Sequence, residues 1–161
     1  MLTRIDRRTE EIQRFRAVPA AFQKTFKTPL KDLERFVSTF LAPFELEKAV
    51  LSTDEVVFEP KTLIRALGSG SDQADDWYEF VVTAEGQKEI SQLLVAALSD
   101  WIDFLFVPSP ELFAIYADHD EFTTFYSNDH SRLTTLCSGL ISSGFEAVPE
   151  YMRESSGDKW R

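Results

Sequence analysis

The amino-acid sequence predicts an α+β fold, in which an N-terminal helical segment precedes a mixed or antiparallel sheet of about four or five strands. Two amphipathic helices are expected on one face of this sheet. Apolar residues recur at helical spacing in two segments of the second half of the chain. Short segments of strand character lie before and between these two segments. The N-terminal segment instead carries helix-capping residues ahead of apolar stripes.

The first 67 residues carry the signals of a mainly helical section. Thr3 can cap a helix that has a sparse apolar stripe. Thr28 and Pro29 combine a capping residue with the residue that favours the first position of a helix. In chain order we expect a helix over residues 3–16, a second helix ending near Pro43, a short strand at 55–60 and one or two helical turns at 61–67.

A loop marks the boundary between two sections of the chain. Residues 68–76, GSGSDQADD, lack apolar periodicity and have the composition of an exposed loop. We therefore divide the chain into a mainly helical front section, 1–67, and an α+β section, 68–161. The length of 161 residues suits one compact domain that contains both sections.

The section after this loop begins with a strand, a helix and a second strand. Residues 77–83 place alternate side chains on two faces, as a strand does. Apolar residues from Ile90 to Trp101 recur at i, i+3, i+4, i+7, i+8 and i+11, which predicts one face of an amphipathic helix. Residues 103–107 are almost wholly apolar and suit a central strand that ends at Pro108. The crossover between these two strands is compatible with a parallel βαβ unit.

A hairpin and a second amphipathic helix follow. Residues 112–117 and 122–126 are two segments of strand character on either side of a short polar loop. Asn128 and Asp129 can cap the next helix, and Gly144 lies where a left-handed C-terminal cap is expected. Both amphipathic helices are expected to pack on the same face of the sheet.

Charge is distributed unevenly along the chain. The formal net charge is −10, yet residues 1–36 carry nine basic and five acidic side chains, a net charge of +4. Residues 72–121 contain twelve acidic side chains and one basic one, Lys88, a net charge of −11. This asymmetry indicates either a surface with a preferred partner or halves that pack on each other. A partner of the acidic surface is expected to be a protein with a basic surface.

These features favour a non-catalytic, acidic protein-binding module. The version that we favour is an immunity- or inhibitor-type protein, which neutralises a basic toxin or nuclease-like enzyme by occluding its cleft. It rests on analogy between protein classes, because no motif identifies a partner. The residues expected to contact the partner are acidic side chains of two segments and one neighbouring tyrosine: Asp72, Asp75, Asp76, Glu79, Asp118, Asp120, Glu121 and Tyr116.

The charged cluster between the two hairpin strands raises an alternative. Asp118, His119, Asp120 and Glu121 could supply metal ligands, or a histidine oriented by a carboxylate, in a metal-assisted enzyme. Neighbouring residues of a strand point to opposite faces, however, and those of a tight turn diverge into water. A charged turn explains the cluster more simply, and a binding epitope is the other alternative. The sequence therefore assigns no catalytic and no metal-binding residue.

Other functional classes find less support. Phosphate-binding glycine motifs, HExxH and GxSxG are absent. With two histidines and a single cysteine, Cys137, the chain cannot build a closed Cys/His zinc site, and this cysteine is expected to pack as a small apolar residue. Aromatic residues lie among acids rather than bases, which disfavours nucleic-acid binding.

The sequence also bears on cofactors and location. No apolar segment approaches the roughly 20 residues of a membrane span, so we expect no membrane association. The N-terminus lacks the apolar core of a signal peptide, which favours a cytoplasmic location. No cofactor is expected. A third possible function is that of a ligand-binding regulatory domain with a pocket between the helical section and the sheet.

Overall fold

The computed structural model describes residues 2–5, 20–68 and 80–153, which form a seven-stranded sheet with four helices. The fold is α+β, as the sequence predicts. None of the described helices is both long enough and apolar enough to cross a membrane. In chain order the elements are β1 (Thr3–Ile5), β2 (Phe22–Lys27), α2 (Leu33–Leu41), β3 (Lys48–Glu55), α3 (Lys61–Leu67), β4 (Val81–Glu85), α4 (Gly86–Ser99), β5 (Asp103–Ser109), β6 (Ala114–Ala117), β7 (Phe122–Ser127) and α5 (His130–Ser142).

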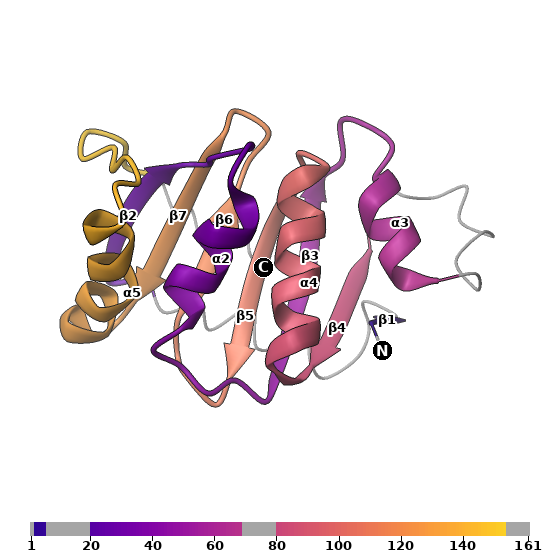
Figure 1. The fold of residues 1–161 in the computed structure, drawn as a ribbon, viewed down its shortest axis with the longest axis horizontal. Coiled ribbons are helices and arrows are strands. Elements are labelled where there is room, and N and C mark those ends of the chain that lie inside the picture. The colour runs from indigo at the N-terminus through magenta and orange to yellow at the C-terminus, as the bar shows by residue number, and fades with distance from the viewer. Residues whose placement is uncertain (1, 6–19, 69–79, 154–161) are drawn as a thin grey trace.

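Strands from distant parts of the chain join in this sheet, whose order is β1-β4-β3-β5-β6-β7-β2 (Figure 1). Every pair of neighbouring strands is antiparallel. Since β3 lies between β4 and β5, these two strands run in the same direction without pairing. The predicted crossover is therefore a split βαβ unit with α4 as its helix.

The sheet is larger than predicted, and the chain does not begin with a helix. Thr3–Ile5 form a strand because they pair with β4, and the rest of the helix expected at 3–16 lies outside the described residues. β2 and β3 are two further strands that the sequence pattern does not indicate. The short strand expected at 55–60 is instead a loop that begins where β3 ends. Pairing with strands far away in the sequence overrides the local pattern in each case.

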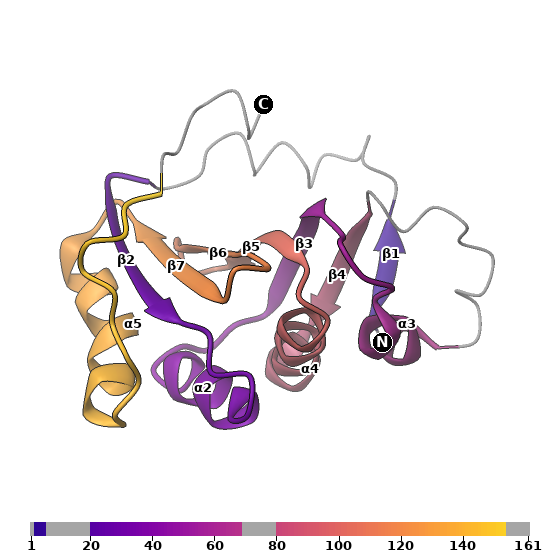
Figure 2. The same cartoon turned by 90° about the horizontal axis from the view of Figure 1, so that it is seen from above.

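Helices cover one face of the sheet, which we call the helix-covered face. Figure 2 shows α2, α4 and α5 together on this face, with α3 beside α4. Aromatic rings fill the space between α2 and the sheet: the centroids of Phe36 and Phe40 lie 6.3 and 5.0 Å from that of Phe125 in β7. All three rings are fully buried, and they belong to the main apolar core.

The opposite face carries no helix among the described residues (Figure 2), and we call it the helix-free face. Its centre is nevertheless buried, because Leu105, Tyr116 and Tyr126 belong to a second apolar cluster. A hydrogen bond of 2.8 Å joins the hydroxyl groups of Thr25 and Thr124 nearby. This face therefore combines apolar packing with buried polar contacts.

Residues 151–153 lie across the helix-free face. The ring of Tyr151 stacks on that of Phe122 with 4.5 Å between centroids. The Gln23 side chain of β2 donates to the carbonyl of Arg153 at 3.0 Å and accepts from the Arg153 backbone N–H at 2.9 Å. These contacts fix the described end of the chain over β2 and β7.

Elements with strong local signals form as expected. The helical turns at 61–67 are α3, and the two strands around the polar loop are the β6–β7 hairpin. Asp129 caps α5 by accepting hydrogen bonds from the backbone N–H groups of Ser131 and Arg132. Gly144 follows this helix with a φ of 85°, in the left-handed region that glycine adopts without strain.

Three local expectations are wrong. The helix expected to begin at Pro29 begins at Leu33, after an N-cap at Asp32. β5 continues through Pro108, which is tolerated because the pairing with β6 has already ended at Phe106. Trp101 does not extend the buried face of α4, because that helix ends at Ser99 and the indole is exposed.

Candidate functional site

Several segments meet at one end of the sheet. β3 ends at Glu55, which pairs with Asp103 at the start of β5. β6 ends at Ala117, which pairs with Phe104, and the β6–β7 turn follows directly. The register of β3 shifts between Thr53 and Glu55, as it does at a β-bulge, and bulges often redirect side chains next to functional sites. Polar side chains of three strands are thereby gathered at one place.

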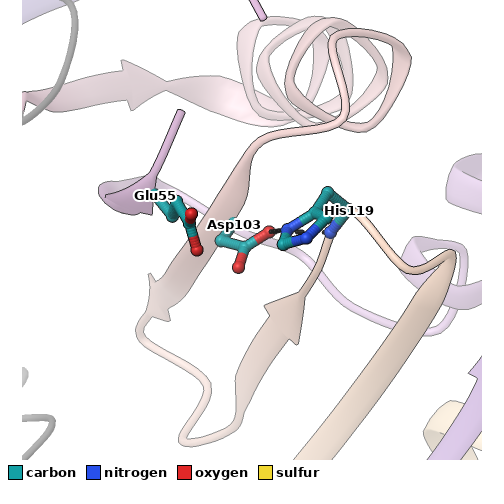
Figure 3. A group of neighbouring side chains, drawn as sticks. All are labelled: Glu55, Asp103 and His119. Atoms are coloured by element: carbon teal, nitrogen blue, oxygen red, sulfur yellow. Dashed lines mark hydrogen bonds and ion pairs between the residues drawn. The ribbon is translucent and has the colours of Figure 1, made fainter. Parts of the chain in front are cut away.

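Asp103 and His119 form a close pair at this end (Figure 3). His119 donates its backbone N–H to Oδ1 of Asp103 at 2.7 Å, and its Nδ1 lies 2.8 Å from the same oxygen. Burial raises the pKa of Asp103, against the opposing effect of the hydrogen bonds from His119. The hydrogen bond with Asp103 raises the pKa of His119. The pair fixes the orientation of the imidazole ring and leaves Nε2 facing outwards, 3.9 Å from Asp120.

Glu55 is the third member of this group. One carboxylate oxygen of Glu55, one of Asp103 and one ring nitrogen of His119 all lie within 4.8 Å of one another. Figure 3 shows the Glu55 carboxylate on the side of Asp103 that faces away from His119. Two carboxylates and an imidazole are groups that can hold a metal ion.

Asp118 has an internal structural role. Its Oδ1 accepts hydrogen bonds from the backbone N–H groups of Asp120 and Phe122, which closes the hairpin turn. Its Oδ2 accepts a hydrogen bond from the Tyr151 hydroxyl at 3.2 Å and forms an ion pair with Arg153. The side chain is almost fully buried. Asp118 therefore links the hairpin to the segment that lies across the helix-free face.

Tyr116 is also engaged within the protein. Its ring is fully buried, and its hydroxyl donates to Oδ2 of Asp54 at 2.5 Å. The guanidinium carbon of Arg153 lies 4.0 Å from the centroid of the ring. Burial and the carboxylate of Asp54 raise the pKa of the Tyr116 hydroxyl far above its ordinary value, so it remains a hydrogen-bond donor.

The residues expected to contact a partner are thus in different environments. Asp120 and Glu121 are exposed at the hairpin tip, with 74% of the Asp120 side chain accessible. The side chains of Tyr116 and Asp118 are instead buried, so they are not accessible to a partner. Within residues 118–121, Nε2 of His119 lies 3.9 Å from Asp120, whereas the Asp118 carboxylate is turned inwards to Arg153. Four further residues, Asp72, Asp75, Asp76 and Glu79, lie outside the described part of the chain.

Two exposed aromatic residues at this end were not identified by sequence reasoning. Phe58 follows β3 and is 57% exposed, and Trp101 follows α4 and is 38% exposed. Their ring centroids lie 5.8 Å apart in an edge-to-face arrangement. The carboxylate of Asp100 accepts hydrogen bonds from the backbone N–H groups of Thr62 and Leu63, and so fixes the start of α3 beside the end of α4.

Trp101 occupies a backbone position that glycine normally fills. Its N–H donates to the carbonyl of Leu98, and the N–H of Ile102 donates to that of Ala97. This is the Schellman pattern of helix termination, with Trp101 in the left-handed conformation at a φ of 58°. α5 ends with the same pair of hydrogen bonds but has Gly144 at the equivalent position. A bulky residue here costs roughly 1 kcal/mol, and such strain is often found at functional sites.

A pocket between the helical section and the sheet was the third expectation. A groove with a volume of about 770 Å³ lies between α2, α3 and α4. It is lined by exposed side chains such as Arg65 and Lys88, and not by the sheet.

Comparisons with models of protein families, with curated proteins and with solved structures find no significant match to this chain.

Proposed function

We propose that this chain is a non-catalytic protein-binding module, an immunity- or inhibitor-type protein that occludes the cleft of a basic toxin or nuclease-like enzyme. The observation that carries the proposal is the exposed Trp101, held in a strained backbone conformation beside Phe58, at the end of the sheet where β3 ends with Glu55. We call this region the acidic–aromatic surface. It consists of Asp54, Glu55, Phe58, Glu59, Trp101, Asp120 and Glu121.

The two aromatic rings supply the apolar centre of such a surface. Tryptophan is enriched among the residues that contribute most to binding energy at protein interfaces, because its large ring buries much area on association. The helix end at Trp101 favours glycine, so the tryptophan carries a conformational cost at this position. A role in binding accounts for its presence at this position.

Acidic side chains around the rings indicate the kind of partner. Glu59 follows Phe58 directly, and the contact of His119 with Asp103 joins the hairpin tip with Asp120 to the same end of the sheet. A negative rim attracts a basic protein and accelerates the encounter. Enzymes that act on nucleic acids have positively charged clefts, because these bind phosphate groups. A nuclease-like enzyme is therefore the partner class that fits this surface.

Trp101→Gly separates binding from folding. Glycine adopts the left-handed conformation freely, and this gain of about 1 kcal/mol offsets part of the apolar burial lost with a side chain that is 38% exposed. We expect it to lose at least about tenfold in affinity for a partner isolated from the source cells with the wild-type chain. Affinity is measured by surface plasmon resonance, and the free energy of unfolding by urea denaturation. The isolated partner should also lose its enzymatic activity when the chain binds.

A charge-matched pair of variants tests the acidic rim. Three acids of the rim are replaced by their amides in one variant, and three exposed acids elsewhere in the other. The first variant should associate about tenfold more slowly at low salt, whereas the second should change little. Equal association rates, or full affinity in Trp101→Gly, would contradict the proposal. The first set is Glu59→Gln, Asp120→Asn and Glu121→Gln, and the second is Glu34→Gln, Glu45→Gln and Glu150→Gln.

A further inference from the structure

We propose that Glu55, Asp103 and His119 form a binding site for a divalent metal ion such as Zn²⁺, which accepts nitrogen and oxygen ligands together. The three side chains come from the end of β3, the start of β5 and the β6–β7 turn (Figure 3). The proposal goes beyond the proposed function, because nothing in it depends on a protein partner.

The distances suit a common ion. Nδ1 of His119 and Oδ1 of Asp103 are 2.8 Å apart. Two ligands at about 2.0–2.1 Å from a tetrahedral Zn²⁺ ion are separated by about 3.3–3.4 Å. The hydrogen-bonded pair therefore needs to open by about half an ångström to admit an ion between its two atoms. One Glu55 oxygen lies within 4.8 Å of one Asp103 oxygen and of one ring nitrogen of His119, and this exposed side chain can rotate to close the remaining gap.

The local charges also call for a cation. The Asp103 side chain is only 9% exposed, and among the described residues hydrogen bonds reach its Oδ1 but not its Oδ2. Glu55, the second carboxylate, has no hydrogen-bond or ion-pair partner for its side chain within the described part of the chain. The imidazole of His119 can compensate the charge of Asp103. The second carboxylate beside it remains unfavourable unless a further cation or a proton compensates its charge. A metal ion that contacts both carboxylates provides this compensation.

The backbone places the ligands before any ion binds. Glu55 and Asp103 are direct partners in the antiparallel pairing of β3 with β5. The backbone N–H of His119 is anchored on Asp103, and the turn that carries His119 is closed by Asp118. Ligands on paired strands and a fixed turn lose little conformational entropy when they coordinate an ion. Coordination through Nδ1 replaces the proton that this nitrogen shares with Asp103, and that proton passes to solvent.

The combination of ligands indicates the class of ion. Mg²⁺ and Ca²⁺ prefer sites made of oxygen atoms alone, whereas an imidazole with carboxylates suits Zn²⁺ and similar ions. His119 is one of two histidines in the chain, and the other, His130, contacts Phe22 at the far edge of the sheet. Three protein ligands leave at least one coordination position for water or for a group of another molecule.

Isothermal titration calorimetry of the 161-residue chain tests the site. The protein is treated with EDTA, dialysed and titrated with ZnCl₂ alone. We expect one Zn²⁺ per chain to bind in a saturable manner and to raise the melting temperature. His119→Ala and Glu55→Gln should each weaken this binding at least about tenfold. Glu55→Gln changes an exposed side chain, so the test remains valid even where His119→Ala lowers stability.

Matched variants provide the controls. His130→Ala removes the other histidine, and Glu59→Gln removes a nearby exposed carboxylate, so both should bind Zn²⁺ within about twofold of the wild type. Absence of saturable binding to the wild type, or equal weakening in the controls, would overturn the proposal. Because the probe is the ion alone, the result does not depend on the proposed function. A chain that binds Zn²⁺ but no protein would contradict only the latter.

Discussion

The two faces of the sheet are held by different kinds of interaction. On the helix-covered face, apolar side chains of α2, α4 and α5 pack against those of the strands. On the helix-free face, a smaller apolar cluster is bordered by hydrogen bonds and by the ion pair of Asp118 with Arg153. Apolar burial stabilises the fold in proportion to the buried area. A buried polar contact stabilises the fold only while both partners are present, because a partner left alone is buried without a hydrogen bond. Substitutions on the two faces should therefore differ in size and even in sign.

The largest effect is expected from Phe125→Ala on the helix-covered face. The ring is fully buried, and those of Phe26 and Phe40 lie 5.9 and 5.0 Å away. Its removal loses apolar burial and leaves a cavity, so the free energy of unfolding should fall by about 3–5 kcal/mol in urea denaturation. Leu112→Ala, at a side chain that is 65% exposed, is the control and should change it by less than about 0.5 kcal/mol. Similar losses in both variants would mean that this face is not the main source of stability.

The next largest effect is expected from Arg153→Ala on the helix-free face. This change leaves the buried carboxylate of Asp118 without its ion-pair partner and removes the guanidinium group from the ring of Tyr116. Loss of one partner of a buried pair should lower the free energy of unfolding by about 3 kcal/mol.

An exposed ion pair gives the matched control for this prediction. Arg132→Ala breaks the contact with Glu111, in which both side chains are about one third exposed, and should cost less than about 1 kcal/mol in the same urea assay. If the two arginine variants are equally stable, the pair of Asp118 with Arg153 is screened by solvent. The helix-free face would then resemble an ordinary surface.

Elements whose signals lie within their own sequence could be predicted. The cap at Asp129 and the glycine after α5 are next to the helix that they delimit, and the turn at residues 118–121 is next to both of its strands. β2 could not be predicted in this way, because its register depends on a strand about 100 residues later: Thr25 pairs with Thr124. A single sequence contains no direct record of such pairing.

The candidate site was only partly visible in the sequence for the same reason. The charge at the hairpin tip is evident, but the contact of His119 with Asp103 depends on the alignment of β6 with β5. Trp101 fits the helical spacing of α4, so the pattern places it in the core. Only the backbone shows that the helix ends two residues earlier and that Trp101 adopts a left-handed conformation.

A smaller loss is expected from Tyr116→Phe, which removes one hydroxyl from the helix-free face. This hydroxyl donates to Asp54, whose carboxylate is exposed and can be hydrated after the change. The free energy of unfolding should therefore fall by about 1 kcal/mol, the net contribution of one hydrogen bond, in urea denaturation. A loss as large as that of Arg153→Ala would show that the hydroxyl holds a wider network together.

The smallest effect, with the opposite sign, is expected from Tyr126→Phe on the same face. The Tyr126 ring is fully buried like that of Tyr116, but its hydroxyl has no hydrogen-bond partner among the described residues. A buried hydroxyl without a partner is unfavourable, so its removal should raise the free energy of unfolding by up to about 1 kcal/mol. The two tyrosine variants differ only in whether the lost hydroxyl had a partner, so their comparison in one urea assay isolates that factor. If Tyr126→Phe is instead destabilised, this hydroxyl has a hydrogen-bond partner beyond the described residues, and the polar contacts of the helix-free face extend beyond those seen within them.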